Sequence, residues 1–75
     1  MKATYWAVVP RDMDIKHVRI EKAETPEEAI TLAVGYPPSK YSHWRVKDLG
    51  PNKSVIQSDR KRVTLLISPT GWRDL

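Results

Sequence analysis

The sequence contains no cysteine and no phenylalanine, and only three of its 75 residues are glycine. The absence of cysteine excludes disulfide bonds and thiolate metal sites. Three scattered glycines do not form a glycine-rich loop of the kind that binds phosphate groups. No apolar run approaches the roughly 20 residues that a membrane-spanning helix needs, and no secretory signal is recognisable at the start. We therefore expect a soluble, cytoplasmic protein.

The chain is short, which limits both its organisation and its stability. We expect a single domain over residues 1–75, in which residues 69–75 form a C-terminal tail. A domain of this size buries only about 60% of the surface that its unfolded chain exposes. Small domains without disulfides or metals often gain stability by association, and this favours a homodimer or a stable complex with a partner.

Positive charge is concentrated in the second half of the sequence, although the net charge of the whole chain is only +4. Residues 1–37 hold five basic and six acidic side chains, whereas residues 38–75 hold eight basic and three acidic ones. This asymmetry favours an acidic partner, either a protein surface or a nucleic acid.

The first third of the sequence is typical of two β-strands. Residues 3–9 are rich in β-branched and aromatic side chains on both faces, which predicts a central strand covered on both sides. Residues 11–14 have the composition of a turn, and residues 15–22 predict a second strand. A β-hairpin is the simplest arrangement of these two segments.

The strongest local signal is a helix start at Thr25. Thr25 is a good N-cap, Pro26 suits the first helical position, and Glu28 completes a capping box. Gly35 followed by two prolines predicts the helix end. An apolar stripe at helical spacing between these signals is formed by Ala29, Ile30, Ala33 and Val34.

The second half predicts three more strands, over residues 43–49, 54–57 and 63–67, whereas residues 70–75 show no periodicity. In the first of these strands, Trp44 and Val46 are expected to face the core. The predicted fold is an α+β domain with the order β-β-α-β-β-β, one mixed sheet and a single helix packed on one face.

The element order is similar to that of the β-grasp architecture of ubiquitin-like proteins. The chain lacks a diglycine tail, and element order alone implies no function.

Catalytic and metal-binding arrangements find little support in the sequence. His17 with Asp12 and Asp14 lacks the ligand spacing of a metal site. The neighbours Ser42 and His43 are expected on opposite faces of a strand, so they do not form a hydrolytic triad with Asp48. We therefore expect no catalysis, no cofactor and no metal.

Basic and aromatic side chains are the best candidates for function, since tyrosine, tryptophan and arginine dominate protein interfaces and also hold single-stranded nucleic acids. Tyr36, Tyr41 and Trp72 lie outside the periodic segments, which favours their exposure, although Trp72 also suits a tail that folds back onto a small core. The predicted partner-binding residues are Tyr36, Lys40, Tyr41, Arg45, Lys47, Arg60, Lys61, Arg62, Trp72 and Arg73.

From this set we expect a small interaction module that binds a protein partner, in an accessory, regulatory or inhibitory role. Its size suits a bacterial or phage-encoded regulator. The alternative is a nucleic-acid-binding protein that uses the basic C-terminal half.

Overall fold

A computed structural model describes residues 3–51 and 68–75 of the chain. In these ranges the order is β1 (Thr4–Pro10), a 3-10 turn η1 (Ile15–His17), β2 (Arg19–Ala23), α1 (Pro26–Val34), a 3-10 turn η2 (Tyr41–His43), β3 (Trp44–Gly50) and β4 (Arg73–Asp74). The small α+β domain is confirmed. The predicted strands at 54–57 and 63–67 lie outside the described residues.

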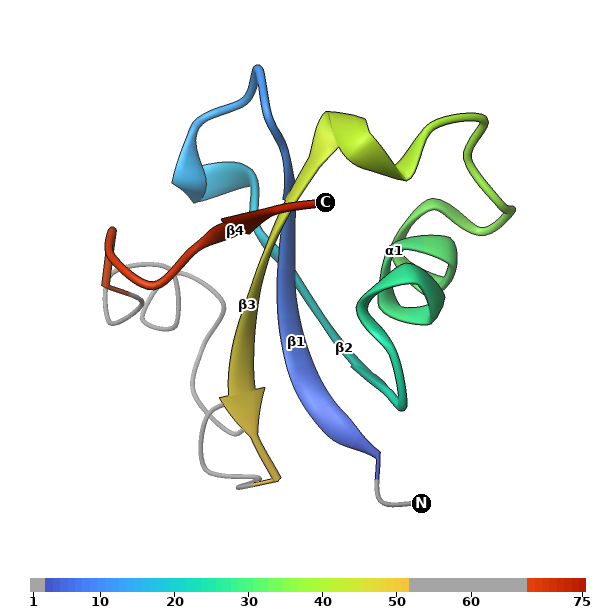
Figure 1. Cartoon of the computed structure of the whole chain (residues 1–75), viewed down its shortest axis with the longest axis horizontal. Coiled ribbons are helices and arrows are strands. Elements are labelled where there is room, and N and C mark those ends of the chain that lie inside the picture. Colours follow the sequence, from blue (N-terminus) through green and yellow to red (C-terminus); the bar gives the residue numbers. More distant parts are fainter. Residues whose placement is uncertain (1–2, 52–67) are drawn as a thin grey trace.

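The sheet has the strand order β2-β1-β3-β4, and each neighbouring pair is antiparallel. The described strands therefore form an antiparallel sheet, whereas a mixed sheet was predicted. β2 and β3 are connected by α1 and run in the same direction, so they would give a mixed sheet if they paired with each other. Instead of pairing side by side, these two strands lie on opposite edges of β1 (Figure 1). The central position predicted for β1 is confirmed.

α1 covers one face of the sheet and ends as the sequence predicts (Figure 1). The buried side chains of this face form the first cluster, and the half-buried Trp44 packs against it. The Nε1 of Trp6 donates a hydrogen bond of 3.0 Å to the carbonyl of Ala23, which satisfies the polar atom of this buried ring. The first cluster consists of Trp6, Val8, Ala23, Ala29, Ile30 and Val46.

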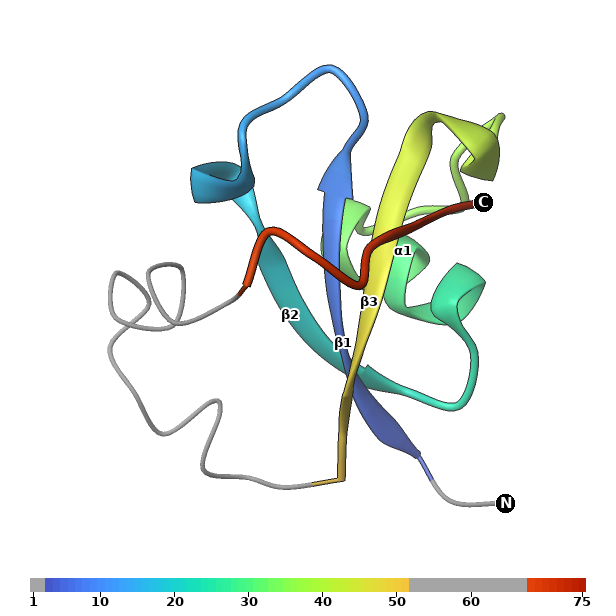
Figure 2. The same cartoon turned by 60° about the vertical axis from the view of Figure 1, so that its left-hand side comes forward.

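The opposite face of the sheet carries a second cluster, which is built on Ala7. In Figure 2, η1 lies to the left of the strands and α1 to the right. Five half-buried side chains pack there, contributed by η1 and the residue after it, by β2, by β3 and by the C-terminal segment (residues 68–75). They are Ile15, Val18, Ile20, Leu49 and Trp72.

The segment 15–22 is not one strand as predicted, because residues 15–17 form a 3-10 turn before β2 begins at Arg19. The amide of Val18 donates to the carbonyl of Ile15 at 3.1 Å. In a strand, Ile15 and Val18 would face opposite sides of the sheet. The 3-10 turn places residues three apart on one side, so that both side chains reach the second cluster.

The N-terminus of α1 shows the predicted cap in a slightly altered form. The amide of Glu28 donates to the Thr25 hydroxyl at 3.1 Å, while the Glu28 carboxylate accepts from the amide of Glu24 at 3.4 Å. The carboxylate thus reaches one residue further back than in a standard capping box. Gly35 has a φ of 93°, which explains why glycine ends this helix. In the described ranges, no helix is long and apolar enough to span a membrane.

Replacing Thr25 with alanine is expected to lower the free energy of unfolding by about 1 kcal/mol, because the substitution leaves the amide of Glu28 without its acceptor. Thr25→Ser keeps the hydroxyl and should stay within roughly 0.5 kcal/mol of the wild type. Urea titrations of the three proteins measure both differences. Equal losses for the two variants would contradict a role of the hydroxyl.

Candidate functional site

The predicted cationic residues of β3 are engaged within the molecule. Arg45 and Lys47 are half-buried on the sheet face opposite α1. The Arg45 guanidinium donates to the carbonyl of Met13 at 3.1 Å, and Lys47 Nζ donates to the carbonyls of Ser68 and Thr70 at 3.2 and 2.9 Å. These hydrogen bonds hold the turn after β1 and the C-terminal segment. Fewer N–H donors of Arg45 and Lys47 therefore remain for an acidic partner.

Trp72 folds back onto the domain and is half-buried. Its ring packs in the second cluster, its Nε1 donates to the carbonyl of Ser68 at 3.0 Å, and the Arg45 guanidinium lies 6.0 Å from the ring centre. Of the two arrangements considered from sequence, the structure shows the one in which this ring covers part of the core.

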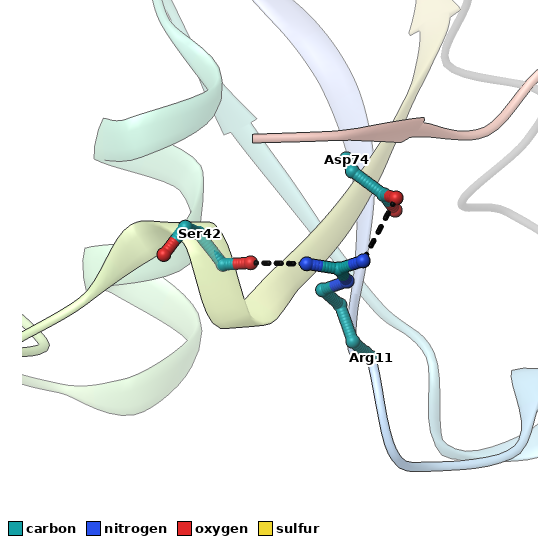
Figure 3. A network of polar contacts seen from close by, with 3 residues as sticks. All are labelled: Arg11, Ser42 and Asp74. Atoms are coloured by element: carbon teal, nitrogen blue, oxygen red, sulfur yellow. Dashed lines mark hydrogen bonds and ion pairs between the residues drawn. The ribbon is translucent and has the colours of Figure 1, made fainter.

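The sequence of residues 70–75 shows no periodicity, but residues 73–74 form β4 against β3. Arg11 secures this strand: its guanidinium contacts the Asp74 carboxylate at 3.1 Å and donates to the carbonyl of Ser42 at 3.2 Å (Figure 3). The backbone amide of Arg11 also donates to the carbonyl of His43 at 2.8 Å. Sequence reasoning missed Arg11, since these partners are distant in the chain and no local pattern connects them.

Tyr41 also differs from its predicted exposure. The side chain is half-buried against the first cluster, and its hydroxyl forms a hydrogen bond of 3.0 Å with that of Thr31. The Thr31 hydroxyl donates to the carbonyl of Glu27 at 3.0 Å, so Tyr41 is the donor in the bond to Thr31. Tyr41 thus anchors the return from α1 to β3.

Tyr36 and Lys40 are exposed, as predicted. Tyr36 is 65% exposed, and Leu32, in the last turn of α1, is 52% exposed. The sequence analysis did not predict Leu32 as a binding residue. Its position outside the apolar stripe of the helix could have indicated that this leucine is exposed. We call Leu32, Tyr36 and Lys40 the α1-end surface.

Arg73 lies apart from this surface, beside a hollow of about 440 Å³ between the start of α1 and the C-terminal segment. Arg73 pairs in register with Val46 on the α1 side of the sheet, whereas Arg45 and Lys47 occupy the other side. Among the described residues, the predicted cations therefore do not gather on one face. The lining of this hollow is Trp6, Glu24, Thr25, Pro26, Glu27, Arg73, Asp74 and Leu75.

The charges of the described residues balance, with eight basic and eight acidic side chains in residues 3–51 and 68–75. The excess of positive charge therefore comes from Lys2 and from residues 52–67. Arg60, Lys61 and Arg62 belong to this group and lie outside the described residues.

Groups of three or more metal-ligating side chains do not occur within residues 3–51 and 68–75. The Asp48 carboxylate, considered above for a triad, accepts hydrogen bonds from the Thr4 hydroxyl at 3.2 Å and from the amide of Gly50 at 2.8 Å. Comparisons with protein-family models, with curated proteins and with solved structures found no match for this chain.

Proposed function

We propose that the chain is a small, non-catalytic interaction module that binds a protein partner through the α1-end surface. The observation that carries the proposal is the exposure of two large side chains, Leu32 and Tyr36, four residues apart at one end of α1. Among the described residues, the remaining exposed large apolar side chain is Met13, at 41%. Tyrosine at an exposed apolar site is typical of interface centres, and Lys40 adds a cation for an acidic partner.

The segment that carries Tyr36 is held at both ends, and this supports a role in binding. At one end, the amide of Gly35 donates to the carbonyl of Thr31 at 2.8 Å. At the other end, Tyr41 bonds to the Thr31 side chain and packs against the first cluster. A surface ordered before binding loses less conformational entropy when the partner docks.

An accessory, regulatory or inhibitory role fits a module of this kind, and so does a β-grasp-like arrangement of the whole chain. The β-grasp-like arrangement also involves residues 52–67, which lie outside the described ranges.

The double substitution Leu32→Ala with Tyr36→Ala is expected to weaken binding of a partner by roughly tenfold or more, because it removes the two large exposed side chains of this surface. The partner is first captured from a native lysate with the wild-type chain, identified, purified and titrated against each variant. The thermal midpoint should hardly change, since both side chains are exposed.

Met13→Ala is the matched control, because it removes an exposed apolar side chain at another place. Equal affinity of the double variant and the wild type would overturn the α1-end surface as the binding site. Capture that disappears after nuclease treatment and falls steeply with salt would favour the nucleic-acid alternative, for which Arg60, Lys61 and Arg62 are the first residues to substitute.

A further inference from the structure

The outer edge of β2 has no strand beside it in the part of the chain that the structure describes. β2 is the first strand in the order β2-β1-β3-β4 and pairs with β1 alone (Figure 1). The strand contains neither proline nor a register shift against β1, two devices that commonly block further pairing at a sheet edge. Val18, directly before it, is also extended. Within residues 3–51 and 68–75, the backbone donors and acceptors on this edge have no strand partner.

We propose that β2 pairs antiparallel with β2 of a second copy of this chain, around a two-fold axis at Ile20. The axis stands perpendicular to the joined sheet, so both copies of α1 cover the same side. An antiparallel two-fold contact of this kind centres on one residue, which faces its own copy. The sequence of β2 decides which residue this is.

Ile20 is the one axis position within β2 that places opposite charges across from each other and no like charges. With the axis at Ile20, Arg19 of each copy lies opposite Glu21 of the other, so two opposite-charge pairs form by symmetry. Axes at Arg19, Glu21 or Lys22 place a charged side chain opposite itself. An axis at Ala23 would require Glu24 and Thr25, which lie beyond the end of β2 and cap α1.

Apolar contacts favour the same axis. Ile20 and the preceding Val18 are half-buried at the margin of the second cluster. Pairing at Ile20 brings the two Ile20 side chains into contact and extends the second cluster from one copy to the other. Charged side chains at a sheet edge usually oppose association, but this register pairs Arg19 with Glu21 instead of exposing them to like charge.

The first test uses charge reversal and measures mass by sedimentation equilibrium between about 10 μM and 1 mM chain, a range that brackets weak self-association. Glu21→Arg and Arg19→Glu should each weaken the dimer by roughly tenfold or more, because each places like charges opposite one another. The double swap Arg19→Glu with Glu21→Arg should restore it. Glu27→Arg, the same charge change on exposed α1, should leave the dimer unchanged.

The second test uses the absence of cysteine from the chain. Residues that face each other at the axis have Cβ atoms about 4.5–5.5 Å apart, near enough for a disulfide after a small shift. Ile20→Cys should therefore form a disulfide-linked dimer under mild oxidation. Lys22→Cys should not, since Lys22 faces Val18 of the other copy and its own counterpart lies several residues away.

A wild-type chain that stays monomeric up to about 1 mM would overturn the proposal. So would a dimer that resists both charge reversals, or equally fast crosslinking of the two cysteine variants. Circular dichroism of each variant checks that it is folded. The proposed dimer contact does not involve the α1-end surface. Leu32→Ala with Tyr36→Ala should therefore leave the sedimentation profile unchanged.

Discussion

Replacing Ile30 with alanine is expected to lower the free energy of unfolding by about 3 to 4 kcal/mol. Ile30 is fully buried in the first cluster, between α1 and the sheet. Its truncation removes apolar contacts and leaves a cavity that the rigid sheet fills only in part. A chain of 75 residues has a total stability of roughly 4 to 11 kcal/mol, so this single change removes a large part of it.

Urea denaturation measures this loss, and the slope of the transition should stay the same. Leu32→Ala is the matched control, since Leu32 lies on the same helix, is 52% exposed and should change stability by no more than roughly 0.5 kcal/mol. Similar losses at Ile30 and Leu32 would contradict the face that α1 turns toward the sheet.

Substitution of Trp72 with alanine is expected to cost about 2 kcal/mol, less than a fully buried tryptophan because the ring is only half-buried. The change removes the packing against the second cluster and the hydrogen bond from Nε1 to the carbonyl of Ser68. It also removes the ring beside the Arg45 guanidinium.

Trp72→Phe separates these contributions, because phenylalanine keeps most of the packing but loses the hydrogen bond, which is worth about 1 kcal/mol. Hydrogen exchange gives a second readout: the amide of Leu75, which donates to the carbonyl of Trp44 at 3.3 Å, should exchange faster in Trp72→Ala. A tryptophan that waits for a partner would instead leave both stability and exchange unchanged.

The helix was predictable because all of its signals are local. Thr25, Pro26 and Gly35 act on their immediate neighbours, and the stripe with Ala29 and Ile30 repeats within nine residues. The central position of β1 was predictable for a similar reason, since apolar side chains on both of its faces require cover on both sides.

The parts that sequence reasoning missed depend on contacts between distant segments. β4 is only two residues long, and both are charged, so no alternation marks it. It pairs with Arg45 and Val46 of β3, and Arg11 contacts its Asp74. The same applies to the predicted binding residues, because Lys47 looks free in the sequence until the C-terminal segment folds over it.

The antiparallel sheet illustrates the same limit. β1 has two equivalent edges, and local composition does not say whether β3 pairs with β2 or crosses to the free edge of β1. Tyr36 and Lys40 are exposed as predicted, and the two prolines after Tyr36 restrict the local backbone.

The central place of β1 also affects the chain while it is being made. β1 precedes every other described element, and its five consecutive residues Tyr5–Val9 are all buried in the finished domain. A ribosome must still synthesise β2 and α1 before β3 emerges to cover the other edge of β1. During that interval the nascent chain exposes an apolar strand with an unpaired edge, which is the kind of surface that promotes aggregation of partly folded chains.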